Sequence, residues 1–132
     1  MTKPTFFFDR CLGRRVPRAL LELGSRCDFE VKYHQGESYR HNLDDDIWLS
    51  AVGQKGWFVL SYDAKWQDEA PAIAAITQHR VGCFYLHGAS SLSFDRLASF
   101  VRSYDKIMQL AKNETRPFIY AFDSRNQARK IL

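Results

Sequence analysis

The sequence lacks several features that would assign it to a large class of proteins. It has no apolar run approaching the roughly 18 residues of a membrane-spanning helix. Its first ten residues, MTKPTFFFDR, lack the long apolar region and small-residue cleavage site of a signal peptide. It has no obvious linker, internal repeat or low-complexity segment. We therefore expect a single cytoplasmic domain over residues 1–132, with no membrane partner.

Cysteine is also scarce. Cys11, Cys27 and Cys83 are three in number and widely spaced, which does not suggest a disulfide framework. They form no Cys-x-x-Cys pair for zinc, and Pro17 stands where a cysteine phosphatase would need Arg after Cys11. The four histidines follow no metal-binding pattern, and we expect His34 and His41 to be loop or surface residues.

The composition of the sequence is typical of a globular domain with a small excess of basic residues. Its 132 residues are 45% hydrophobic, enough for a hydrophobic core without metal or disulfide support. Nineteen basic residues against 15 acidic ones give a net charge of +4, which is compatible with an anionic partner such as a nucleic acid.

Short apolar runs alternate with helical patterns along the chain. Predicted strands lie at residues 5–8, 27–34, 57–61, 82–86 and 117–122. Predicted helices lie at residues 16–23, 44–53, 71–78 and 93–112, and residues 124–132 form a basic tail or short helix. Alternating strands and helices predict an α/β fold, a three-layer α/β/α sandwich around a central, mainly parallel sheet.

Acidic residues stand where these strands end. Asp9 directly follows the first strand, Asp63 follows the strand at 57–61, Asp123 follows the last, and residues 44–46 open a helix. Any one of them alone suits a turn or a helix cap. Parallel strands present their carboxyl ends at one edge, so together these residues predict clustered carboxylates. Such a cluster suits a hard divalent cation such as Mg²⁺.

Two stretches, FFFDRCLGRRVPRALLELG and DDDIWLSAVGQKGWFVLSYDAKW, resemble the PIN-like ribonucleases, particularly the VapC-type toxins of toxin–antitoxin pairs. The resemblance covers roughly residues 5–86. It lies in an apolar strand followed by Asp, an acidic residue three positions before a helical Trp, and a hydrophobic strand ending Ser-x-Asp.

The resemblance implies a metal-dependent endoribonuclease that cleaves RNA through a water activated by Mg²⁺ or Mn²⁺. The implied catalytic residues and metal ligands are Asp9, Asp45 and Asp63. A fourth acidic ligand, common in such domains, could be Asp68, Glu69 or Asp123, and Asp46 could replace Asp45. The resemblance also implies a cognate antitoxin and, often, a toxin homodimer, for which the long helix at 93–112 is a candidate contact.

Cations and aromatic residues beside these acids would bind the RNA. We expect phosphate contacts from the basic side chains near Asp9 and Asp63, namely Arg10, Arg14, Arg15 and Lys65. Tyr62 and Trp66 could stack on exposed bases. Any one of these side chains could instead have a purely structural role, as a solvated surface cation or as an aromatic residue of the core or its rim.

Two alternatives stay open. A non-catalytic PIN-like module that binds RNA or protein would keep the basic face without needing converging carboxylates. A phosphorelay receiver domain shares the α/β architecture and strand-end acids, with Asp63 as its central carboxylate. It usually has an acidic pair after the first strand and a Lys after the last, whereas this chain has Asp9-Arg10 and Asp123-Ser124-Arg125.

Overall fold

The computed structural model describes residues 3–9, 14–34, 45–62, 70–88 and 92–132, and for Ser25 and Asp45 it describes only the backbone. Strands and helices alternate along the chain. The strands are β1 (Thr5–Phe8), β2 (Glu30–Tyr33), β3 (Phe58–Ser61), β4 (Gly82–Tyr85), β5 (Phe118–Phe122) and β6 (Ala128–Lys130). The helices are α1 (Arg15–Leu21), the short 3-10 helix η2 (Gly24–Arg26), α2 (Asp45–Gln54), α3 (Ala70–His79) and α4 (Ser93–Asn113).

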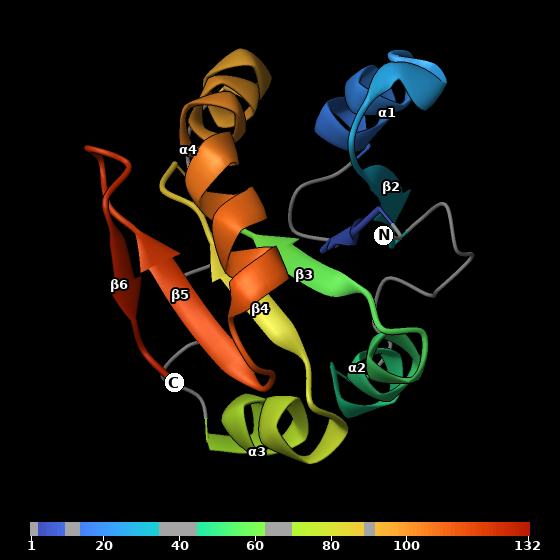
Figure 1. Cartoon of the computed structure of the whole chain (residues 1–132), viewed down its shortest axis with the longest axis vertical. Helices are drawn as coiled ribbons and strands as arrows, with labels where there is room; N and C mark the ends of the chain where they lie inside the picture. Colours follow the sequence, from blue (N-terminus) through green and yellow to red (C-terminus); the bar gives the residue numbers. More distant parts are fainter. Residues whose placement is uncertain (1–2, 10–13, 35–44, 63–69, 89–91) are drawn as a thin grey trace.

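The strands form one sheet in the order β2-β1-β3-β4-β5-β6 (Figure 1). The pairs β1–β2, β1–β3, β3–β4 and β4–β5 are parallel, and β6 pairs antiparallel with β5. The predicted α/β/α class with a mainly parallel sheet is therefore confirmed. In the described part of the chain, no helix is long and apolar enough to cross a membrane.

The prediction for residues 124–132 was wrong, because this segment contains a strand. Asp123 accepts backbone hydrogen bonds through its side chain in a tight turn, and Asn126 adopts a positive φ of 61° there. The chain reverses, and Ala128 comes to lie opposite Phe122. A short polar segment has little strand signal of its own, but the open edge of β5 offers it hydrogen-bond partners.

Helices cover both faces of the sheet. Side chains on one face, such as Phe6 and Leu60, pack with Leu20 of α1 and with Phe100 of α4, which crosses in front of the strands in Figure 1. Alternate side chains along the same strands, such as Phe7, pack on the opposite face with α2 and α3. The period-two alternation of a strand thus sends consecutive phenylalanines of β1 into two separate cores.

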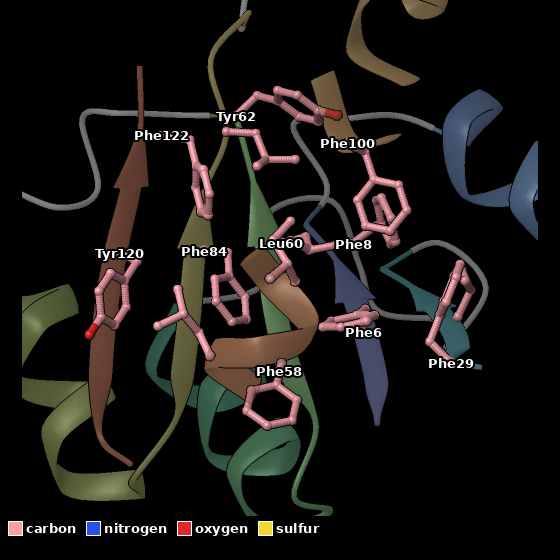
Figure 2. Close-up of a cluster of buried hydrophobic side chains, with 14 of the residues drawn as sticks. Phe6, Phe8, Phe29, Phe58, Leu60, Tyr62, Phe84, Phe100, Tyr120 and Phe122 are labelled. Atoms are coloured by element: carbon pink, nitrogen blue, oxygen red, sulfur yellow. The ribbon is translucent and has the colours of Figure 1, made fainter. Parts of the chain in front are cut away.

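The core under α4 is built from aromatic rings. Phe6 has no exposed surface, and its ring centroid lies 5.8 to 6.4 Å from those of Phe29, Phe58, Phe84 and Phe100. Figure 2 shows Phe6 and Phe8 close to Phe100, on one face of the strands. Tilted and edge-to-face pairs of this kind stabilise a core beyond the burial of their area, by about 0.5–1.5 kcal/mol each.

This packing brings the carboxyl ends of the inner strands to one edge. Phe8 of β1 lies opposite Tyr33 of β2 and Leu60 of β3, and Ser61 lies opposite Tyr85 of β4. The residues that follow these positions therefore lie beside one another, although they are far apart in the sequence.

Candidate active site at the carboxyl edge of the sheet

Asp9 lies at the carboxyl edge, directly after β1. Its backbone N–H donates to the carbonyl of Leu60 at 3.1 Å, so the parallel ladder with β3 continues through this residue. Two positions after Phe7, Asp9 shares the face that α2 and α3 cover. Its side chain is only 4% exposed, so the fold holds an acidic group inside the sheet edge.

Ser61 fixes the position of that carboxyl group. The Ser61 hydroxyl, which is fully buried, donates a hydrogen bond of 3.1 Å to Oδ2 of Asp9. A hydroxyl that donates to a carboxylate limits its rotation and leaves the other lone pairs to further ligands. Ser61 is therefore a positioning residue for Asp9, and it is the Ser of the sequence pattern Ser-x-Asp.

The pKa of Cys83 on β4 depends on its burial and on the charge of Asp9. Burial, chiefly, and the negative charge of Asp9 together hold the pKa of the Cys83 thiol far above its usual range. The thiol is therefore protonated near neutral pH and is a poor nucleophile.

A row of polar side chains crosses the sheet at this edge. His34 donates its backbone N–H to the Phe8 carbonyl at 3.1 Å, which places it beside Asp9, while Ser61 lies opposite Tyr85. The row is therefore His34, Asp9, Ser61 and Tyr85. All four are at least nine-tenths buried. His34 directly follows β2 in a turn, which agrees with the expectation of a loop residue, but its side chain is fully buried, so it is not a surface residue.

Packing against α2 explains the burial of His34. Its imidazole centroid lies 6.2 Å from the rings of both Phe7 and Trp48, and neither of those side chains is exposed. The polar row could have been suspected from the sequence, because each member directly follows or ends an apolar strand. Sequence alone does not align the four strands, so it could not show that these residues are neighbours.

The start of α2 lies near this row. Trp48 stacks on Phe7 with ring centroids 5.4 Å apart, which fixes α2 over β1. Asp45 is the first residue of α2 and stands three positions before Trp48, one helical turn closer to the helix start. The backbone of Asp45 is therefore near the row, and its side chain lies outside the described part of the structure.

Two other acidic residues have different partners. Oδ1 of Asp46 lies 3.2 Å from Nε2 of His79, so this exposed carboxylate links α2 to α3. Asp123 accepts hydrogen bonds from the backbone N–H groups of Arg125 and Gln127, at 2.8 and 3.0 Å. It follows β5, three strands from β1 in the sheet order, and the structure gives it the role of a turn residue.

The predicted RNA-contacting residues also differ in where the structure places them. Arg14 and Arg15 are both exposed at the start of α1, the helix that follows β1. Tyr62 is 2% exposed, and its hydroxyl donates to the carbonyl of Arg96 on α4, so its ring belongs to the core and does not stack on bases. The residues Arg10, Asp63, Lys65, Trp66, Asp68 and Glu69 lie outside the described ranges.

The described residues supply part of the oxygen-rich ligand set that a hard cation needs. Asp9 offers carboxylate oxygens, Ser61 holds one of them, and the soft ligand Cys83 is kept protonated. This chemistry fits Mg²⁺ or Mn²⁺ better than a thiolate-binding metal. Among the described residues, no three His, Cys, Asp or Glu side chains gather into a complete metal site.

Comparison with known proteins agrees with this architecture. The model of a protein family described as PIN like domain matches residues 4–88, more than half of the chain. The match encloses the polar row and the whole of α2, and it ends before α4. No curated protein and no solved structure matches the chain.

Proposed function

Because this chain belongs to the family of PIN-like domains, we propose that it is a metal-dependent endoribonuclease. PIN-like domains are commonly nucleases, and the observation that carries the proposal is the buried carboxyl group of Asp9. Burying a carboxylate costs free energy, and a cation bound at the sheet edge would offset that cost. The hydrogen bond from Ser61 prepares the group for that role.

In this proposal Asp9, Asp45 and Asp63 hold Mg²⁺ or Mn²⁺. When bound, such an ion would supply activation of a water molecule near neutral pH and stabilisation of the charge that develops on the phosphate. Ser61 restricts the rotation of Asp9, and the packing of Trp48 on Phe7 fixes the helix that begins at Asp45. The role of the chain in this proposal is therefore to hold three carboxylates close together, and the bound cation would offset the repulsion between their charges.

The substrate we propose is RNA, held through its phosphates. Arg14 and Arg15 are exposed where the chain enters α1, on the helix nearest in sequence to Asp9. With Arg10 and Lys65 they would bind the phosphates flanking the scissile bond. Phosphate contacts do not distinguish one base from another. Any sequence preference in cleavage would therefore come from other parts of the protein surface.

We further propose that the protein is the cytoplasmic toxin of a toxin–antitoxin pair. Two large apolar side chains on α4 are exposed, Phe94 at 69% and Val101 at 60%, and they lie two helical turns apart. An antitoxin or a second copy would cover them. Phe94→Ser with Val101→Ser should abolish antitoxin capture or shift a dimer to monomer in analytical ultracentrifugation, and unchanged association would contradict this part of the proposal.

The test of the nuclease proposal measures cleavage of a mixed-sequence, single-stranded RNA with Mg²⁺, with Mn²⁺ and with EDTA. Asp9→Asn keeps the size of the side chain and removes its charge, so we expect a folded protein with at least a hundredfold less cleavage. Asp45→Asn and Asp63→Asn should act alike. The matched control is Asp105→Asn, an exposed carboxylate on α4, which should cleave as the wild type does.

Binding of Mn²⁺, followed by electron paramagnetic resonance, separates loss of metal from loss of chemistry. Wild-type protein should bind the ion and Asp9→Asn should not. Cleavage that persists in EDTA, or in a folded Asp9→Asn protein, would overturn the proposal. RNA binding without any cleavage would favour the non-catalytic module.

A further inference from the structure

Two strands form the edges of the sheet, and their charges differ. β2 lies at one side and β6 at the other (Figure 1). β6 has three residues, of which Arg129 and Lys130 are basic. A short edge strand with repeated positive charge resists pairing with a second copy of itself. β2 instead carries one charge of each sign, Glu30 and Lys32.

The backbone of β2 directs half of its polar groups away from the sheet. The N–H groups of Glu30 and His34 donate to carbonyls directly before β1 and at its end, at 2.9 and 3.1 Å. Alternate residues of a strand direct their backbone groups to opposite sides, so those of Val31 and Tyr33 are directed outward. No other described strand pairs with β2 on that side. An outer side of this kind is a template for another strand.

The sequence around β2 is complementary to itself in the reverse direction. Its residues are Phe29, Glu30, Val31, Lys32 and Tyr33. If two copies pair antiparallel about Val31, Glu30 of each copy lies opposite Lys32 of the other. Phe29 likewise lies opposite Tyr33. A two-fold axis requires such reciprocal contacts, because the same surface is used twice.

This register also uses the outward backbone groups. In an antiparallel pair, opposed residues alternate between positions that exchange two backbone hydrogen bonds and positions that exchange none. Val31 lies opposite itself at a hydrogen-bonded position, as its outward groups require. Glu30 and Lys32 lie at the other kind of position, where opposed Cα atoms are closest, at about 4.5 Å. Opposite charges stabilise a strand pair there.

Other registers bring like charges together or lose the opposite ones. Centring the pair on Glu30 or on Lys32 would place that residue opposite itself. Centring it on Phe29 would place Glu30 opposite Asp28, and centring it on Tyr33 would remove both contacts between Glu30 and Lys32. Like charges directly opposite one another destabilise a strand pair. The charges of β2 therefore favour one register and oppose its neighbours.

Glu30 and Lys32 keep their charges uncompensated within the described part of the chain. Glu30 is exposed and accepts one hydrogen bond of 3.3 Å from the Thr5 hydroxyl. Nζ of Lys32 lies 5.9 Å from the centre of the Trp57 ring. A carboxylate accepts several hydrogen bonds, and a ring face does not cancel an ammonium charge. Neither described residue forms an ion pair within the chain.

Apolar surface lies beside this strand. Helix α1 contacts β2 and leaves Leu21 and Leu23 exposed, at 46% and 56%. Both residues stand at the end of α1, just before the chain enters β2. A stable interface buries about 1,200–2,000 Å² in total, so two short strands need such flanking surface to complete it.

We propose that the protein forms a homodimer in which β2 pairs antiparallel with β2 of a second copy, centred on Val31. The two sheets then form one continuous sheet across the two-fold axis. Because the paired strands run in opposite directions, the two carboxyl edges face opposite ends, and neither copy completes the candidate active site of the other. The proposal is independent of nuclease activity, and its surface is separate from Phe94 and Val101 on α4.

The experiment is sedimentation equilibrium of the full chain from micromolar to millimolar concentration. We expect a monomer–dimer equilibrium. Glu30→Lys brings two pairs of cations together, and Lys32→Glu brings two pairs of acids together, so each should weaken dimerisation about tenfold or more. An equal mixture of the two variants restores opposite charges at both contacts and should form a mixed dimer.

Matched controls change an exposed charge by the same amount elsewhere. Asp105→Lys and Lys106→Glu lie on α4 and should dimerise as the wild type does. Asp9→Asn should also remain dimeric, so loss of nuclease activity and loss of the dimer are distinguishable. Circular dichroism will verify that Glu30→Lys and Lys32→Glu keep the fold, and formation of the mixed dimer would show it independently.

Hydrogen exchange locates the contact on the backbone. The amides of Val31 and Tyr33 should exchange more slowly as the protein concentration rises, because they gain partners only in the dimer. The amides of Glu30 and Lys32 are directed toward β1 and should be protected at every concentration. Exchange at Val31 that does not depend on concentration would overturn the proposed pairing.

Three further results would overturn the proposal. The first is a wild-type protein that stays monomeric at millimolar concentration, which would leave the edge of β2 to a different chain. The second is equal dimerisation of Glu30→Lys and Asp105→Lys, or the absence of a mixed dimer. The third is a dimer that is lost in Phe94→Ser with Val101→Ser and unaffected by changes in β2, which would place the second copy on α4.

Discussion

The hydroxyl of Ser61 donates to Oδ2 of Asp9 across 3.1 Å, joining two residues that are 52 positions apart in the sequence. One residue ends β3 and the other directly follows β1, and these strands are parallel neighbours. The bond couples the central strands of the sheet to the group on which the proposed chemistry depends. It also makes Ser61 a sharper probe of that chemistry than Asp9, because its removal leaves the carboxylate in place.

Ser61→Ala should reduce metal-dependent RNA cleavage by about 10- to 100-fold, the usual effect of losing a group that orients a metal ligand. Asp9 would keep its charge but gain rotational freedom. Unfolding in urea should show a loss of about 1–3 kcal/mol, since a buried acceptor loses a donor. Ser103→Ala, which removes a 3.3 Å hydrogen bond to Asn126 far from Asp9, is the control and should leave cleavage intact.

Gly53→Ala should destabilise the protein, although Gly-to-Ala changes inside helices usually stabilise by about 0.5–1 kcal/mol. A Cβ at this position would lie 2.5 Å from the backbone oxygen of His79, so α2 and α3 would have to separate. Overpacking of this kind costs about 1–3 kcal/mol. Urea unfolding of Gly53→Ala beside Gln54→Ala, an exposed neighbour, would measure it, and a stabilised Gly53→Ala would contradict the close approach of the two helices.

Cys83 should resist thiol reagents in the folded protein. Its burial, with the charge of Asp9, raises its pKa, whereas Cys27 is only half-buried. Mass spectrometry after iodoacetamide treatment at pH 8 should find Cys27 labelled and Cys83 labelled only in urea. Rapid labelling of native Cys83 would show that β4 is accessible.

The same raised pKa predicts a dependence of stability on alkaline pH. The folded state keeps the Cys83 proton, while the unfolded state loses it near the ordinary value of 9.0. This contribution to stability is complete below that value and is lost as the pH rises above it. The difference in unfolding free energy between wild type and Cys83→Ala should therefore shrink from pH 8 to pH 10, and a constant difference would be inconsistent with the buried thiol.

Asp123 should contribute to stability only above acidic pH. Backbone hydrogen bonds, first from Gln127 and then from Arg125, lower its pKa below the ordinary 3.8. The contribution is present above that value and is lost as the pH falls through the lowered pKa. Asp123→Asn keeps an acceptor oxygen for the turn but cannot titrate, so its urea midpoint should depend less on pH between 2.5 and 5. Equal pH dependence in both proteins would remove Asp123 from the acid response.

Local patterns were sufficient to predict most of the secondary structure and the fold class. Period-two runs such as TFFF and period-3.6 runs such as that of α4 reflect the geometry of single elements, which neighbouring residues determine. The placement of Asp9 at a strand end and the position of Asp45 at a helix start are also local, and they were predicted correctly. The family match over residues 4–88 agrees with those motifs.

Errors arose where a side chain's surroundings come from another part of the chain. His34 was expected to be a loop or surface residue; it lies in a turn after β2, but α2 buries its side chain against Trp48. Tyr62 was a candidate for base stacking, but its hydroxyl reaches α4. Residues 128–130 have little strand pattern, and they form β6 because β5 offers an open edge.

The sequence by itself therefore determined most of the elements, their order, and which acids end strands, because these follow from spacing along one chain. Only the tertiary structure decided which of these residues are neighbours. Strand register aligned His34, Asp9, Ser61 and Tyr85 into one polar row, and the strand order left β2 at an edge of the sheet. Register and packing also depend on contacts between distant segments, which the pattern within a single element does not align.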